Sequence, residues 1–572
     1  MTDGVSQVSN ASDPAPDTLL ADWPLRPWVL AAMLALAGLL LHFLLFRYNV
    51  LYNSEPIKPW RAAAAALVFF GSLSAAFSMA PGQFRASGLF ALGAGLVMGG
   101  LAWHMAWMQE PYSGEPFAFA AGVFATVLAL PLFQAGFHRT RFSTDYKITH
   151  FHVWTDAISA GGALAFVGLS WLMLVLINAL LQLVGIELIQ QAMNQEWFGW
   201  VWSSGAFGAA LGVLRNNLKI IGSLQNVVLI VLSLLAIPLA LGLIVFLVAL
   251  LASGGQALWD ATDAATPVLL ACAVGCFVFT NSIVREDDEA LSRNRVMRIA
   301  AMVLAAGVLP LALFAAISMG IRINQHGLSP ERLWALVTVV VAVAYGIAYW
   351  VALARGRKQA WAAMLRRANL HLAAATCVLA LVLALPLIDF GGISASNQIT
   401  RLQSGRVSAR DFDFTALRWD FGPAGRRALA RLAAGEGEVA DLAKAAQAQT
   451  ERVWDWQREQ MGDGFTGELR VQPEDPELRA LVLAYLESNP WQCSELCVAL
   501  DLGTTAEGAR DVALIQGYNF QRIQLGSDGV ASEVSEEPRQ FPEFNAQSTV
   551  EIREETRRAI YVNGERIGEP LE

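Results

Sequence analysis

Ten long apolar stretches in the first 388 residues constrain the fold of this chain more than any other feature. A helix needs about 20 predominantly apolar residues to cross a bilayer core, where its backbone polar groups must be satisfied internally. The sequence therefore predicts an α-helical polytopic membrane bundle. The predicted spans are residues 27–46, 62–79, 87–107, 117–137, 157–186, 227–251, 264–284, 299–320, 333–354 and 370–388.

Charged residues are concentrated in the last third of the chain. Residues 389–572 contain 31 acidic and 19 basic side chains, a net charge of −12, whereas the whole chain carries −9. This contrast separates a membrane part from a solvated part. It predicts four regions: a disordered acidic N-terminal tail (1–26), the transmembrane bundle (27–388), a post-membrane linking segment (389–435) and a soluble, small α+β domain (436–572).

Residues 197–213 form an eleventh apolar segment, which is short and rich in glycine and could either cross the membrane or re-enter it. Lys and Arg favour cytoplasmic loops, and eleven spans place about 16 of them inside and about 5 outside, against about 14 and 7 for ten spans. We therefore favour eleven spans, with the N-terminus cytoplasmic and the C-terminal domain outside. The long span 157–186 is expected to tilt or to project beyond the lipid.

The solvated part mixes helical and strand patterns. The stretches 426–432, 437–460 and 475–488 are expected to be helices, and strands are expected at 496–502, 511–516, 522–525, 549–553 and 559–562. Residues 526–529 and the pair Asn563–Gly564 are typical of hairpin turns. Upstream, Ser329 and Pro330 are typical of a helix start.

Few polar groups in the predicted spans suggest chemistry. No Asp, Glu, Lys or Arg lies at mid-membrane depth, which argues against an ion-coupled carrier. Asn178 and Gln182 share one helix face, either as a polar site or as interhelical hydrogen-bonding groups. His42 and His104 are further polar residues of the spans.

The spacing of several histidines allows a test for a metal site. His138, His150 and His152 flank a loop with Asp145 and Asp156, but a spacing of two suits a strand better than the helix expected there. We predict no metal site.

The five cysteines favour packing over a metal cluster. Cys272 and Cys276 are expected to pack within a span. Cys493 and Cys497 form a disulfide only if the chain turns between them, because four extended residues span about 13 Å and a disulfide joins α-carbons about 5.5 Å apart.

No phosphate loop, zinc-protease pair or nucleophile elbow occurs in the sequence, so no catalytic, cofactor-binding or metal-ligating residue is predicted and the chain is not expected to be an enzyme. Gly-x-x-x-Gly spacing occurs at Gly95–Gly99 and Gly208–Gly212, where it serves either packing within the chain or dimerisation.

Three stretches carry a resemblance to a known family. They are residues 325–334 (Gln-His-Gly-Leu-Ser-Pro-Glu-Arg-Leu-Trp), 393–407 and 412–429. Together they resemble a family of bacterial, mainly Gram-negative, inner-membrane proteins known only as domain of unknown function 4153, over residues 145–432. The resemblance implies an inner-membrane location and a shared fold, and it brings no activity or catalytic residues. Relatives often carry an acidic loop in the last domain, but this chain has Asp501-Leu-Gly-Thr-Thr there, which lacks most calcium ligands.

These features favour a membrane platform that presents an acidic periplasmic interaction domain. The alternative is a passive permease or exporter of a small solute. The expected partners are the lipid bilayer and, through the C-terminal domain with Trp454 and Trp456, an envelope protein or glycan. The acidic balance argues against nucleic acid, and the sequence sets no oligomeric state.

Overall fold

The computed structural model divides the chain into two compact units, Met1–Ala448 and Gln449–Glu572. Residues 1–22, which include most of the expected tail, the Trp454–Trp456 pair and the expected strand 549–553 lie outside the described residues. The described residues are 23–46, 57–108, 113–253, 265–449, 452, 468–488, 492–493, 496–505, 508–516, 519–526, 531–533, 558–562 and 565–571.

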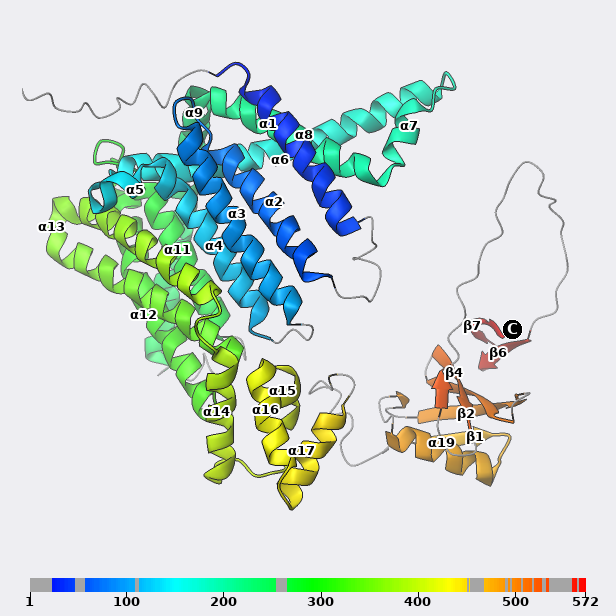
Figure 1. The fold of residues 1–572 in the computed structure, drawn as a ribbon. Helices are drawn as coiled ribbons and strands as arrows, with labels where there is room; N and C mark the ends of the chain where they lie inside the picture. Colours follow the sequence, from blue (N-terminus) through cyan, green and yellow to red (C-terminus); the bar gives the residue numbers. More distant parts are fainter. Residues whose placement is uncertain are drawn as a thin grey trace, which may run out of the picture. The chain divides into compact units, whose positions relative to one another are not determined.

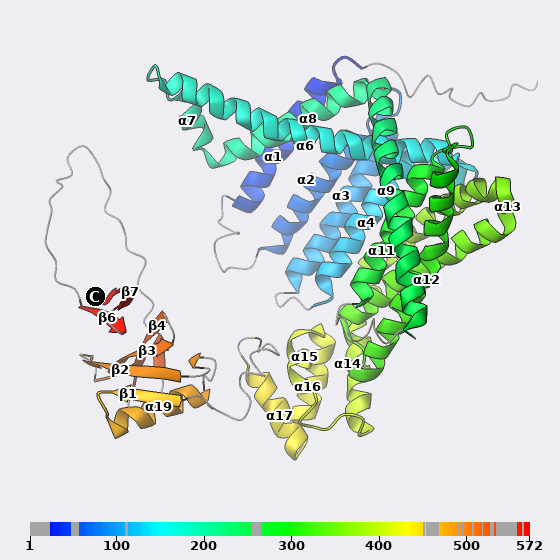
Figure 2. The same cartoon turned by 180° about the vertical axis from the view of Figure 1, so that it is seen from behind.

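The first unit is helical throughout its described part (Figures 1 and 2). Ten of its described helical segments are long and apolar enough to cross a membrane, and they coincide with the ten predicted spans. The fold is therefore that of an integral membrane bundle. Its principal helices are α1 (Arg26–Leu41), α2 (Pro59–Ser78), α3 (Phe84–Trp107), α4 (Glu115–Gln134), α6 (Tyr146–Gln182), α8 (Glu196–Asn216), α9 (Leu218–Ala252), α11 (Ala265–Val284), α12 (Arg295–His326) and α13 (Pro330–Ala384), with the short helices α5 (Phe137–Thr140) and α7 (Leu188–Met193).

Helix α13 supplies two of the ten spans, Pro330–Gly356 and Ala360–Ala384. The chain reverses between them, since Gly356 lies directly against the backbone of Trp361, a contact that no straight helix makes. Figure 1 shows the two limbs of α13 meeting at the left of the molecule. Glycine is required there because any Cβ would collide with Trp361.

Helix α6 has 37 residues and runs across the neighbouring helices rather than beside them (Figures 1 and 2). A helix of this length exceeds the roughly 20 residues that one crossing needs. Most of its large apolar side chains from Leu164 onward are exposed to the surroundings, as expected of a helix solvated by lipid.

Helices α1 and α8 pack closely and antiparallel. Gly212 of α8 lies against Pro27 of α1, whereas Ser204 of α8 lies against Gly38 further along α1. Gly208 lies between these contacts, against Leu30, and a side chain at Gly208 or Gly212 would collide with the α1 backbone. This Gly-x-x-x-Gly pair therefore serves packing within the chain.

Four amphipathic helices follow the bundle: α14 (Phe390–Gln403), α15 (Phe414–Trp419), α16 (Gly422–Ala433) and α17 (Glu438–Ala448). Their apolar faces share one core that includes Phe412, Leu417, Leu429 and Ala443. Helix α17, which we expected to open the soluble domain at residue 436, thus belongs with the helices before it because its alanines complete their core.

The second unit is a mixed α+β fold. Strand β1 pairs parallel with β2, helix α19 connects them, and β2 to β5 pair antiparallel in the order β1-β2-β3-β4-β5. The bounds are β1 (Glu468–Gln472), α19 (Pro476–Ser488), β2 (Leu496–Thr504), β3 (Arg510–Gln516), β4 (Asn519–Leu525) and β5 (Ala531–Glu533), with a separate antiparallel pair, β6 (Arg558–Val562) and β7 (Glu565–Leu571).

Both faces of this sheet are covered, as the side chains of β3 show, which point alternately to opposite sides. Val512 and Leu514 share a core with Leu478 and Val482 of α19. Their neighbours Ala513 and Ile515 instead pack with Ile560 of β6.

Candidate functional site

The turn between α12 and α13 is the anchor point of the candidate site. Helix α12 ends at Gly327, whose φ of +75° places it in the left-handed region that glycine tolerates. Helix α13 then begins as the sequence predicts: Ser329 accepts a hydrogen bond from the Arg332 backbone N–H (3.4 Å), and Pro330 occupies the first helical position.

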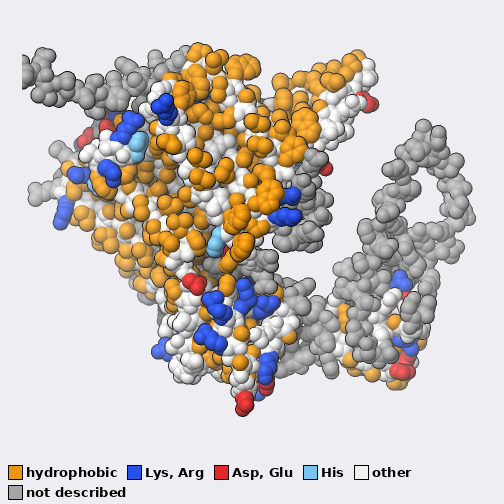
Figure 3. All heavy atoms as spheres, in the orientation of Figure 1, with side chains coloured by type: hydrophobic (Ala, Val, Ile, Leu, Met, Phe, Trp, Pro, Cys, Tyr) orange, Lys and Arg blue, Asp and Glu red, His pale blue; other side chains and the backbone are white. Residues whose placement is uncertain are grey.

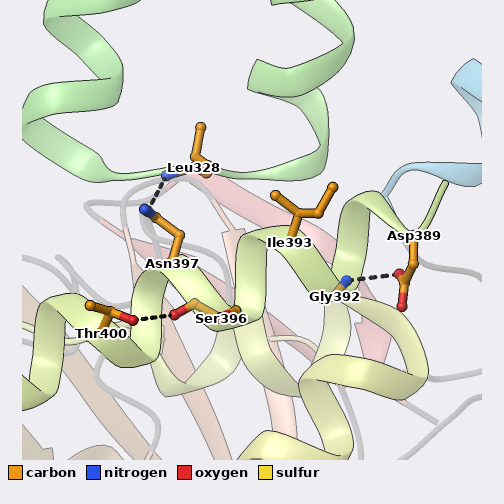
Figure 4. A pocket seen from close by; sticks show the side chains of 7 residues that line it. All are labelled: Leu328, Asp389, Gly392, Ile393, Ser396, Asn397 and Thr400. Carbon is orange, nitrogen blue, oxygen red and sulfur yellow. Dashed lines mark hydrogen bonds between the residues drawn. The ribbon is translucent and has the colours of Figure 1, made fainter.

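Three side chains of α14 form hydrogen bonds with the main chain of this turn. Asn397 Oδ1 accepts from the Leu328 N–H (2.9 Å), as Figure 4 shows. Gln398 Nε2 donates to the carbonyls of His326 (2.8 Å) and Leu328 (3.0 Å). Arg401 donates through Nη1 and Nη2 to the carbonyls of residues 324 (2.9 Å) and 325 (2.6 Å). We call these contacts the α14 clamp.

The clamp suits the end of a helix electrostatically. The last carbonyls of α12 have no partner within the helix and carry a partial negative charge, which a guanidinium complements. A Cβ at Gly327 would lie 2.7 Å from Gln398 Nε2 and 2.8 Å from Arg401 Cδ. Glycine is therefore needed both for the backbone conformation and for the close approach of α14.

A shallow groove of about 690 Å³ runs between α14 and the turn (Figure 4). Asp389 caps the first turn of α14 by accepting from the Gly392 N–H (2.7 Å). The groove is thus a consequence of how α14 docks. Its lining residues are Leu328, Asp389, Gly392, Ile393, Ser396, Asn397 and Thr400.

Aromatic rings and the start of α4 extend the contact with α14. The ring of Trp334 lies 5.2 Å from that of Phe390 and 6.4 Å from that of Phe117. Ser113 Oγ donates to the Asp420 carbonyl (3.0 Å), joining the start of α4 to α15. The helices after the bundle are therefore attached at several independent places.

A closed hydrogen-bond ring lies at the opposite end of the bundle, between α11 and the two limbs of α13. Asn281 donates to Tyr349 Oη (2.8 Å), Tyr349 donates to Asn369 Oδ1 (3.0 Å), and Asn369 donates back to Asn281 Oδ1 (2.6 Å). All three side chains are buried. Because these polar groups satisfy one another, the ring joins helices and does not line an open path.

Charged loops meet at this same end. Lys147 forms an ion pair with Asp287 (2.7 Å), and this hydrogen bond holds the pKa of Asp287 below its ordinary value. Arg366 donates to the Val284 carbonyl (3.0 Å) and pairs with Asp288. The contacts tie α6, α11 and α13 together.

A second polar group at this end was missed by sequence reasoning. Arg215 donates to the Ala76 carbonyl (2.6 Å) at the end of α2, and Arg26 donates to the Arg215 carbonyl (2.7 Å). Gln134 donates to the Phe77 carbonyl (2.7 Å). These side chains lie at helix ends, outside or at the edge of the apolar stretches. Hydropathy therefore does not indicate that they contact one another's helices.

The polar pair expected to share one face of the fifth span has a packing role. Asn178 donates to Gln190 Oε1 (2.7 Å), and Gln182 reaches the same oxygen at 3.5 Å, linking α6 to α7. Of the two roles expected for this pair, the structure therefore shows hydrogen bonding between helices. The second Gly-x-x-x-Gly pair, Gly95 and Gly99, likewise faces the α2 backbone. A Cβ added at either glycine would lie 3.0 Å from a carbonyl oxygen of α2.

The histidines of α6 do not converge. His150 faces Glu286 at 3.8 Å and lies beside Tyr146 and Trp154. No group of three His, Cys, Asp or Glu side chains is arranged to hold a metal within the described residues. Cys272 and Cys276 are free thiols.

The second unit contains a disulfide between Cys493 and Cys497, whose α-carbons are 5.9 Å apart. This separation agrees with the distance of about 5.5 Å between the α-carbons of a disulfide. In the same unit, Arg510 pairs with both Asp501 and Asp475 (2.7 Å each). The hydrogen bond from Arg510 lowers the pKa of Asp475.

A family model described as a domain of unknown function (DUF4153) matches residues 63–432, nearly two thirds of the chain. The chain belongs to the DUF4153 family. No curated protein and no solved structure matches it. The DUF4153 match begins within α2 and ends within α16, so it includes the whole α14 clamp. The second unit lies beyond the matched residues.

Proposed function

We propose that this DUF4153 protein is a platform in the inner membrane of a bacterium, which fixes an acidic extramembrane domain to the membrane surface. The observation that carries the proposal is the α14 clamp. Five hydrogen bonds from Asn397, Gln398 and Arg401 attach the helices after the bundle to the bundle itself. A rigid mount of this kind suits presentation of a domain.

The proposed orientation places α14 and the second unit in the periplasm. Helix α8, with 21 residues, pairs antiparallel with α1, so a membrane-crossing α1 implies a crossing α8 and eleven spans in all. An odd number of spans puts the two termini on opposite sides. The bundle end opposite α14 carries Arg139, Arg285 and Arg366, as expected of a cytoplasmic face. The disulfide supports an oxidising compartment for the second unit.

The second unit is the proposed contact with an envelope partner. Residues 449–572 contain 24 acidic and 11 basic side chains, so this unit carries the negative charge of the solvated part. Basic proteins, cations or neutral glycans are the partners that such a surface favours.

The decisive experiment compares the full chain with a variant that lacks residues 449–572 and keeps the clamp. We expect the shortened protein to insert normally but to lose the proteins crosslinked to the full chain in native membranes. Retention of the same partners, or solute flux catalysed by the purified full chain in liposomes, would refute the platform and favour the permease.

Orientation is tested independently of function. A periplasm-dependent phosphatase fused after Glu572 should be active, and cysteines placed at Glu196 and Arg215 should label from opposite faces. An inactive phosphatase together with a fluorescent cytoplasmic reporter at the same position would reverse the orientation.

A further inference from the structure

A second groove, on the lipid-facing side of the bundle, differs in chemistry from the groove beside the clamp. It measures about 670 Å³, within the range of small-molecule sites, and lies between α3 and the end of α13. Leu96, Leu101 and Leu385 contribute apolar walls, and Gly100 leaves part of one side open. An occupant must therefore present an apolar body.

The rim of this groove is amphipathic. Trp103 and Trp107 stack at 6.4 Å between ring centroids, and both are exposed. His104 lies between them in sequence and also lines the groove. Tryptophan is enriched where acyl chains meet headgroups, so the rim marks the depth at which a lipid changes from apolar to polar.

The helices that follow the groove along the chain carry basic side chains. The last lining residue, Pro386, is three residues before Asp389 at the start of α14, and Gly391 packs against the Phe421 carbonyl at the start of α16. Figure 3 shows Lys and Arg side chains gathered over α15 and α16, next to the hydrophobic surface of the bundle.

The charge of this region differs from that of the second unit. Residues 414–433 contain four arginines and one acid, Asp420. Arg427 and Arg431 are exposed and four residues apart, so they share one face of α16. Arginine binds phosphate through paired, charge-assisted hydrogen bonds.

We propose that this groove binds one acyl chain of an anionic phospholipid, whose phosphate lies against the arginines of α16. The apolar walls accept the chain, the tryptophan rim sets its depth, and Arg427 and Arg431 select the negative headgroup. The lipid is then a specific ligand that joins the bundle to the helices after it.

The test measures phosphatidylglycerol binding to the purified full chain by native mass spectrometry, with phosphatidylcholine as the neutral probe. Gly100→Phe fills the groove, and its Cβ would have no atom within 4 Å. Gly93→Phe is the matched control, because Gly93 is two turns away on the same face of α3, equally open, and outside the groove. We expect Gly100→Phe to lose the bound lipid and Gly93→Phe to keep it; equal binding by both would overturn the proposal.

Headgroup selection is tested with Arg427→Gln/Arg431→Gln. Each basic residue near an anionic surface contributes about fivefold, so the double variant should weaken phosphatidylglycerol binding about 25-fold and leave phosphatidylcholine binding unchanged. Arg406→Gln/Lys444→Gln removes the same charge elsewhere and should have little effect. An equal loss in both double variants would mean general electrostatic attraction and refute the site.

A measurement on the unaltered protein removes any dependence on folding of the variants. Phosphatidylglycerol with a photoreactive acyl chain should crosslink mainly to residues 96–107. Crosslinks spread evenly over the lipid-facing helices would overturn the proposal.

Discussion

Arg401 is the residue through which α14 holds the bundle most strongly, since one guanidinium bonds two adjacent carbonyls at the end of α12. Every partner of the clamp on the turn is a main-chain atom. Substitutions of the side chains in residues 324–328 therefore leave those main-chain partners in place, apart from the constraint at Gly327, whereas changes in α14 remove the side chains that bond to them.

We expect Arg401→Gln to lower the free energy of unfolding by about 1.5–3 kcal/mol, the usual contribution of hydrogen bonds to a charged group. Thermal unfolding of the full chain in nanodiscs measures the effect. Arg406→Gln, an exposed arginine beyond the end of the same helix, is the control and should stay within about 0.5 kcal/mol of the parent. Equal stability of the two variants would contradict the role given to the clamp.

The buried ring at the opposite end gives a second prediction. Tyr349→Phe keeps the packing but leaves Asn281 and Asn369 each without one partner in a buried site. The expected cost is about 1–3 kcal/mol, seen as a lower unfolding temperature. Tyr345→Phe, one turn earlier in α13, removes a hydroxyl that bonds to Thr376 and lies outside the ring, and it should cost less. The reverse order would mean that the ring adds little to stability.

Helices α1 and α8 are a closely packed pair, and glycine is what permits their approach. A small residue at such a contact lets backbones come together, and van der Waals packing then stabilises the pair. The pairing also extends the bundle by a helix whose own hydropathy is too low to mark it as a span.

We expect Gly212→Leu to separate α8 from α1, because its side chain would collide with the backbone of Pro27. Overpacking of this kind costs about 1–3 kcal/mol. Cysteine crosslinking between the two helices should fall in this variant. Gly199→Ala in the same helix meets only Trp171 at 3.8 Å and should crosslink like the parent. Undiminished crosslinking in Gly212→Leu would show that the helices are not in close contact.

The sequence predicts a helix or strand well where a single property, such as hydropathy or a capping residue, determines it. The ten spans follow from hydropathy alone, and the start of α13 follows from Ser329 and Pro330. Strand β1 was missed because five residues with two buried side chains give too short an alternation. The clamp was not predictable either, since its partners on the turn are main-chain N–H and carbonyl groups, which every non-proline residue carries whatever its side chain.

Over the whole molecule, the two units differ in composition and in what stabilises them. The bundle is held by apolar packing and buried hydrogen bonds, whereas the second unit adds a disulfide to a small core.

We expect Cys493→Ser/Cys497→Ser to destabilise the second unit by about 2 kcal/mol, from the loop-closure entropy of so short a loop. In the parent protein, maleimide labelling of denatured samples should detect three free thiols, Cys272, Cys276 and Cys377, before reduction and five after it. Five reactive thiols before reduction would place the second unit in a reducing compartment and contradict the proposed orientation.

The clamp also has a mechanical consequence. A pull on the chain beyond Ala448 is shared by α14 and by the Ser113–Asp420 contact, because the helices before that residue share one core. The five hydrogen bonds to the α12–α13 turn bear this load together with the covalent link through residues 385–389. Tension on the second unit is thereby delivered in part to the turn between two membrane helices, and α14 reduces the force that the last span alone would bear.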